Sequence, residues 1–125
     1  MAAMPQDVQR AWNRREGAIV FVTVGPEGIP NAIYATCVGM HGDDKVVIAD
    51  NYFGKTRDNI RAGSRGAVLF LTPEKKSYQV KGPVEYHVTG EIYEEMKGWN
   101  PATHPGNAAV VVNVEEVYSG SERIL

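Results

Sequence analysis

The sequence predicts a mainly β fold, an antiparallel barrel of six strands with short helices. Short apolar stretches recur along the chain and are separated by turns rich in glycine, proline and aspartate. Residues 77–90 alternate apolar and polar side chains, which is typical of a long strand with one buried face. A helix is inserted only after the third strand, so the strand–helix alternation of a doubly wound parallel sheet is missing.

The first half of the chain divides cleanly into elements. Val8, Ala11 and Trp12 recur at i, i+3 and i+4, which predicts a short amphipathic helix at about 5–15. Strands are expected at 18–24, 31–40 and 45–50, with turns at 25–28 and 42–44. The next helix is expected at 55–62, because Gly63 is a natural C-cap.

The second half is predicted to complete the barrel. Gly82 and Pro83 interrupt the long strand and predict a bend or bulge there, as a curved sheet requires. The other elements expected are a strand at 67–71, a turn at 73–76, a short helix at 91–98, a Pro/Gly-rich loop at 100–107, a last strand at 108–114 and a loosely tied tail at 119–125.

Size and composition indicate a soluble globular protein. The 125 residues are expected to form a single domain, 1–125, and 43% hydrophobic with 22% charged residues is ordinary for this class. A net charge of −2 argues against nucleic acid or an anionic membrane as a partner. The N-terminus lacks the layout of a signal peptide, and no apolar run approaches the roughly 20 residues of a membrane helix. A cytoplasmic location is therefore expected.

Cysteine and histidine give no sign of a metal site. The single cysteine, Cys37, excludes an intramolecular disulfide and is expected to be a buried, inert thiol. His41 and His87 have no partner at metal-ligand spacing, whereas His104 lies in the loop and is the histidine best placed to reach a substrate. No catalytic side-chain arrangement is predicted.

Residues 49–56 carry the strongest chemical signal. They follow an apolar strand and lead into a helix with glycine, lysine and threonine at its start, which suits a phosphate. The block nearly matches the nucleotide-binding pattern G-x-x-x-x-G-K-[ST], but Ala49 stands where the first glycine is needed. The surrounding strands also do not alternate with helices, so a nucleoside-triphosphatase is rejected.

Four segments together resemble the small FMN-binding split-barrel proteins related to pyridoxamine 5′-phosphate oxidase. The most specific is A-D-N-Y-F-G-K-T-R-D-N-I-R at 49–61. The others are E-G-I-P-N at 27–31, S-Y-Q-V-K-G at 77–82 and the apolar strand 109–114. Their order and spacing cover about residues 10–118.

The resemblance implies a six-stranded split barrel that forms a homodimer, with two FMN molecules in the interface clefts. Lys55 and Thr56 would hold the phosphate. The resemblance assigns the rest of the cofactor site to Ile33 and Tyr34 on the long strand and to Gln79 at a flavin carbonyl. Backbone groups of Ala49, Asp50 and Asn51 would bond the edge of the ring, and Trp99 would lie near the flavin of the other subunit. A barrel core of this size is too small to enclose FMN, which also favours an interface site.

Other interpretations of the same residues stay open. Lys55 and Thr56 would also suit a plain helix start, and Asn51 a plain turn. Gln79 would also suit an exposed strand face, and Trp99 a packing role.

The implied function is an FMN-dependent oxidoreductase with a nicotinamide or another small redox partner. The alternative is a non-enzymatic electron carrier or a flavin storage protein. Oxidation of pyridoxamine 5′-phosphate itself ranks lower, because the chain is much shorter than the full oxidase. Some split barrels bind a deazaflavin or haem instead of FMN.

Overall fold

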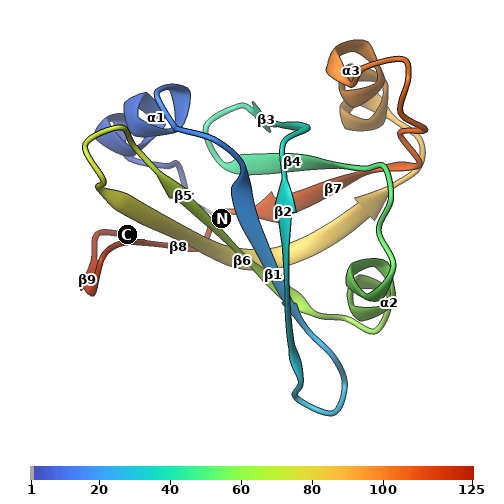
Figure 1. The fold of residues 1–125 in the computed structure, drawn as a ribbon, viewed down its shortest axis with the longest axis horizontal. Coiled ribbons are helices and arrows are strands. Elements are labelled where there is room, and N and C mark those ends of the chain that lie inside the picture. The colour runs from blue at the N-terminus through green and yellow to red at the C-terminus, as the bar shows by residue number, and fades with distance from the viewer. Residues whose placement is uncertain (1) are drawn as a thin grey trace.

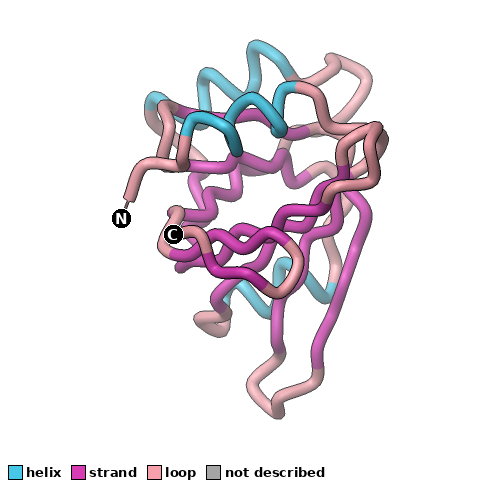
Figure 2. The backbone as a smooth tube through the Cα atoms, turned by 90° about the vertical axis from the view of Figure 1, so that its left-hand side faces the viewer, coloured by secondary structure: helices cyan, strands magenta, loops and turns pink. Residues whose placement is uncertain are grey.

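The computed structural model describes residues 2–125 as a curled antiparallel sheet with three short helices, so the predicted mainly β class is confirmed (Figures 1 and 2). The helices are α1 (Gln6–Asn13), α2 (Lys55–Arg61) and α3 (Glu91–Trp99). The strands are β1 (Ile19–Val24), β2 (Pro30–Ala35), β3 (Val38–His41), β4 (Lys45–Asp50), β5 (Arg65–Leu71), β6 (Ser77–His87), β7 (Ala108–Asn113), β8 (Glu116–Ser119) and β9 (Glu122–Arg123).

The strand predicted at 31–40 is wrong in one respect, because the structure divides it into β2 and β3 at Thr36 and Cys37. The strand order is β2-β1-β5-β6-β7-β4-β3. β2 and β3 follow each other in the chain but lie at opposite ends of this order. β2 pairs with β1, and β3 pairs with β4. The interruption carries the chain from one edge of the sheet to the other. If β2 and β3 are counted as one broken strand, they form a six-stranded ring with β1, β5, β6, β7 and β4.

The bend predicted in the long strand is confirmed. Residues 77–83 of β6 pair with β5, whereas residues 84–87 pair with β7. The change of partner comes directly after Gly82 and Pro83, and at Gly82 an added Cβ would lie 1.6 Å from the carbonyl oxygen of Asn113. Only glycine allows this approach of two backbones, so the curvature of the sheet is encoded at this position.

The main core fills the concave side of the sheet and is closed at one end by α1. Its fully buried members include Ile19, Phe21, Ile48 and Val110, and the ring of Trp12 from α1 meets Phe70 edge to face at 5.2 Å. A second, smaller cluster lies where Met96 of α3 packs on the other face of β4 and β7. Since both faces are covered, β7 is buried throughout. These strands form a rigid base for the turn that follows β4.

The helices agree with prediction to within a few residues. Gly63 follows α2 with φ of +94°, as expected for a glycine at a helix end. Gly54 occupies the N-cap position without a side-chain cap, so Thr56 does not cap α2. No helix within residues 2–125 is long and apolar enough to cross a membrane.

The tail was predicted to be loosely tied, and this is wrong. Residues 116–119 form β8, which pairs with both β6 and β9. Val117 is fully buried, and its carbonyl oxygen accepts a hydrogen bond from the Ile124 N–H at 2.8 Å. Ile124 and Leu125 pack against the main core. The tail is held because Ile124 and Leu125 add their apolar side chains to the core.

Candidate functional site

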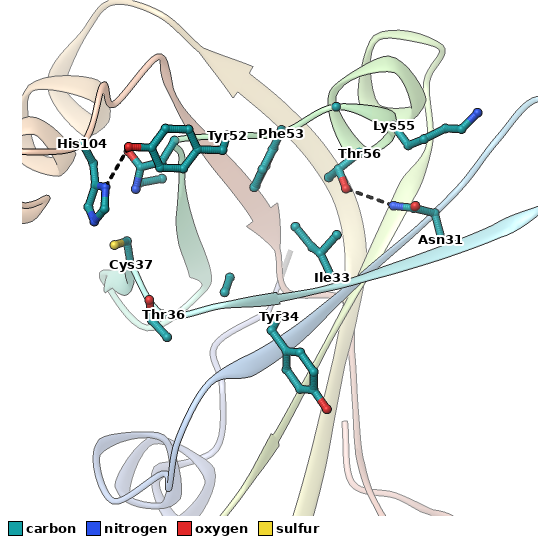
Figure 3. A pocket seen from close by; sticks show the side chains of 14 residues that line it. Asn31, Ile33, Tyr34, Thr36, Cys37, Tyr52, Phe53, Lys55, Thr56 and His104 are labelled. Carbon is teal, nitrogen blue, oxygen red and sulfur yellow. Dashed lines mark hydrogen bonds between the residues drawn. The ribbon is translucent and has the colours of Figure 1, made fainter.

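A pocket of about 320 Å³ lies between β2, the break that follows it, and the turn that joins β4 to α2 (Figure 3). The first residues of α2 form one end, and the break with the 100–107 loop forms the other. Its lining residues are Asn31, Ile33, Tyr34, Ala35, Thr36, Cys37, Ala49, Asn51, Tyr52, Phe53, Gly54, Lys55, Thr56 and His104.

The α2 end of the pocket is polar and electropositive. Thr56 is buried, and its hydroxyl oxygen accepts a hydrogen bond from Asn31 Nδ2 at 2.9 Å. Because the oxygen is the acceptor there, the hydroxyl hydrogen is left to donate elsewhere. Lys55 is exposed, and no hydrogen bond or ion pair within residues 2–125 engages its ammonium group.

A buried polar network supports this end from behind. Thr23 is fully buried, and its hydroxyl oxygen accepts a hydrogen bond from Asn59 Nδ2 at 3.0 Å. Asn31 Nδ2 lies 3.4 Å from the same oxygen. The network joins β1, β2 and α2, and it thereby fixes the position of Thr56 against the pocket.

The middle of the pocket is apolar. Ile33 and Ala35 of β2 form one wall, and Ala49 and Phe53 form the other. The ring of Phe53 lies 6.3 Å from that of the buried Phe21, which anchors this wall to the core. An apolar slot with polar groups at its ends is the usual form of a small-molecule site.

At the far end, two residues from distant segments meet. The Tyr52 hydroxyl and His104 Nδ1 are hydrogen-bonded at 3.1 Å, and their rings stand edge to face (Figure 3). Cys37 lies beside them. The expectation that Cys37 is a buried thiol is wrong, because the strand breaks at this residue and leaves it half-buried in the pocket wall.

Asn51 fastens the 100–107 loop to the turn after β4. Its side-chain amide exchanges two hydrogen bonds with that of Asn100, at 3.0 and 2.9 Å, and its oxygen also accepts from the Gly106 N–H at 2.9 Å. This loop carries His104, so Asn51 indirectly places a residue of the pocket wall. The sequence held no signal for this pairing of distant asparagines.

Asp50 faces away from the pocket. Its side chain is fully buried and accepts hydrogen bonds from Arg57 Nε at 2.8 Å, from the Tyr86 hydroxyl at 2.6 Å and from the Phe53 N–H at 3.0 Å. Burial alone would raise the pKa of Asp50, but these hydrogen bonds outweigh it and hold the pKa below its usual value. Burial and the hydrogen bond given to Asp50 raise the pKa of Tyr86.

Of the nine predicted cofactor residues, six line the pocket: Ile33, Tyr34, Ala49, Asn51, Lys55 and Thr56. The side chain of Tyr34 points away from it and is 80% exposed (Figure 3).

The other three predicted residues lie elsewhere. Asp50 is in the buried network, and Gln79 lies on β6 opposite Leu69 and Tyr118. Trp99 lines a neighbouring groove.

Sequence reasoning missed several lining residues, notably Asn31, Tyr52 and Phe53. All three lie within or beside motifs that the sequence marked, and adjacency to the motif was the available signal. No group of three or more His, Cys, Asp or Glu side chains within residues 2–125 is arranged to hold a metal ion.

The sequence model of the family described as pyridoxamine 5′-phosphate oxidase matches residues 5–120. The chain belongs to this family. An uncharacterized protein of Methanocaldococcus jannaschii is 34% identical over 111 residues, which cover 83% of this chain and 74% of that protein. The resemblance seen in the sequence is therefore confirmed.

Two solved structures show how widely the family fold is shared. HupZ of Group A Streptococcus superposes with a TM-score of 0.83 at 23% identity, covering 98% of both chains. An FMN-binding protein of Syntrophomonas wolfei superposes with a TM-score of 0.76 at 21% identity, covering 92% of this chain and 83% of that one. At these identities the likeness establishes the fold alone.

Proposed function

We propose that the pocket binds FMN and that the protein is an FMN-dependent oxidoreductase. The observation that carries the proposal is the order of chemistry along the pocket. Lys55, Thr56 and Asn31 supply donors at one end, and an apolar slot follows them. This order matches a phosphate, a linker and a flat ring system.

The donor set suits the phosphate. A phosphate monoester carries up to two negative charges and is best held by charge-assisted hydrogen bonds. Lys55 brings a full charge with no carboxylate partner within residues 2–125, and Thr56 brings a hydroxyl hydrogen that no hydrogen bond within the same residues uses. The supporting network of Thr23 and Asn59 keeps this end in place before a ligand arrives.

The apolar slot suits the ring. Ile33, Ala49 and Phe53 offer apolar contact surfaces, and Asn51 of the turn after β4 also lines the pocket. When bound, FMN would supply the hydride or electron chemistry, while the chain supplies binding and orientation. No catalytic side chain is required by this division of labour.

We further propose that two copies pair through the outer face of β1, β2 and β5. On this face Tyr34 stands beside Val20, and Val20 stands beside Leu69. Tyr34 is 80% exposed and Leu69 is 42% exposed, which makes an apolar surface that a second copy would cover. Gln79 continues the same row across β6, so its proposed contact with flavin would be made across the interface.

The first experiment is the absorbance spectrum of the purified protein, followed by titration of the apoprotein with FMN. A flavin spectrum and tight binding are expected. A colourless protein that does not bind added FMN would refute the proposal. The spectrum of a deazaflavin or of haem would show that the protein binds that cofactor instead of FMN.

Two further measurements separate the remaining parts of the proposal. Light scattering is expected to give the mass of two chains, and a monomer would remove the shared site. Reduction by NADH or NADPH, with turnover on an added acceptor, supports the enzyme. Bound FMN without turnover by any donor would favour an electron carrier or a storage protein.

A further inference from the structure

A second cavity, of about 520 Å³, adjoins the flavin pocket. We call it the β3–α3 groove, because it lies between β3 and the C-terminal part of α3 and the residues after it. Its lining residues are Thr36, Cys37, Val38, Gly39, Met40, Glu95, Trp99, Pro101 and His104. Three of them, Thr36, Cys37 and His104, also line the flavin pocket. The two spaces are therefore neighbours on either side of the break between β2 and β3.

An aromatic ring forms part of the groove wall. Trp99 ends α3 and lies over Gly39 of β3, where an added Cβ would be 3.5 Å from two atoms of the indole. At this distance the indole is in van der Waals range of the strand. Trp99 is half-buried in this position, so part of its ring borders the groove.

The groove is acidic. Glu95 is the one carboxylate in its lining within residues 2–125, and neither lysine nor arginine lines it. The Glu95 carboxylate lies 3.3 Å from Nδ1 of His41, which can hold the carboxylate in place by a hydrogen bond. An anion that entered this groove would meet a carboxylate and no fixed cation.

We propose that the β3–α3 groove binds a planar aromatic ring that carries a positive charge. The face of an indole attracts cations, and a carboxylate within the same groove adds a direct charge interaction. Phosphorylated rings are disfavoured by the same charge distribution. The role of this ligand as a reactant next to FMN rests on the proposed function, but the binding site itself does not.

The test uses three small rings that differ mainly in charge: 1-methylnicotinamide, a cation; nicotinamide, which is neutral; and nicotinate, an anion. Each is titrated by calorimetry at pH 8 into the FMN-loaded protein and into the protein without FMN. The cation is expected to bind most tightly and nicotinate least. Glu95→Gln is expected to lower the affinity for the cation by about two- to five-fold, the range of one exposed charge pair.

Two further variants complete the test. Trp99→Leu is expected to weaken binding of the cation by about two- to five-fold, the range of an exposed cation–π contact. Glu94→Gln is the matched control, because Glu94 is an exposed acid on the same helix that does not line the groove. Its affinities are expected to equal those of the unaltered protein.

The outcomes separate this inference from the proposed function. Equal affinities for the three rings, no measurable binding, or the same effect of Glu95→Gln and Glu94→Gln would overturn the groove site. Failure to bind FMN would overturn the proposed function, while the titrations without FMN would still decide on the groove.

Discussion

The two sides of the turn between β4 and α2 differ sharply, although they come from one uninterrupted motif. On the inner side, the buried Asp50 carboxylate pairs with the partly exposed Arg57, and the Tyr86 hydroxyl also donates to it. On the outer side, Lys55 and Thr56 border the pocket. The difference teaches that one motif can combine residues that line a pocket with residues whose side chains build the turn, and that sequence alone does not distinguish the two kinds.

Helix geometry explains the division. Successive residues of an α-helix point about 100° apart, so Thr56 and Arg57 must face different surroundings. Thr56 turns toward β2 and Asn31, whereas Arg57 turns toward the end of β4 and Asp50. Thr56 therefore borders the pocket, whereas Arg57 meets a buried carboxylate.

The largest expected effect is on the inner side. Asp50→Asn leaves the Arg57 guanidinium opposite a neutral amide, and the free energy of unfolding is expected to fall by about 2–4 kcal/mol. This is less than the roughly 3–5 kcal/mol lost when a fully buried pair is broken, because the Arg57 side chain is 26% exposed. Urea denaturation measures it. Asp58→Asn on the exposed side of α2 is the control and should change stability by less than about 0.5 kcal/mol.

The same comparison can be made by titration. The pKa of Asp50 is lower in the folded protein than in the unfolded chain. The ionised carboxylate therefore adds to the free energy of unfolding above about pH 4, the ordinary pKa of aspartate. That contribution is lost as the pH falls through the folded pKa. The stability difference between the unaltered protein and Asp50→Asn should therefore shrink below about pH 4. A difference that stays constant down to pH 2 would contradict the assignment.

On the outer side, the effect is expected on binding instead of on folding. Lys55→Ala should weaken FMN binding by about 1.5–3 kcal/mol, the scale of a hydrogen bond to a charged group, with little change in stability. Lys75→Ala, in the turn between β5 and β6, is a matched loss of one exposed lysine. FMN affinity is measured by calorimetry. Equal FMN affinities of the two variants would mean that Lys55 does not hold the phosphate.

The sequence was most informative where a local pattern has one structural meaning. The alternation in 77–90 predicted β6, and Gly82 marked its bend, because the residues that cause these features are adjacent in the chain. The break at Cys37 was not foreseeable, since it arises from pairing with two strands on opposite edges. The resemblance placed the backbone of Asp50 along the ring, and the role of its side chain was not foreseeable because Tyr86, which bonds it, is 36 residues away.

The smallest effect tests the link between the two sides of the turn. Thr56→Val keeps the shape of the side chain but removes the hydroxyl, so FMN affinity should fall by about 0.5–1.5 kcal/mol. Asn31 Nδ2 would also lose its 2.9 Å acceptor and keep only the longer contact to Thr23, so stability should fall by a similar amount. Thr56→Ser retains the hydroxyl and should restore both quantities. If Thr56→Val lowers stability but leaves FMN affinity unchanged, Thr56 belongs with Asp50 among the residues that build the turn, and Lys55 alone would hold the phosphate.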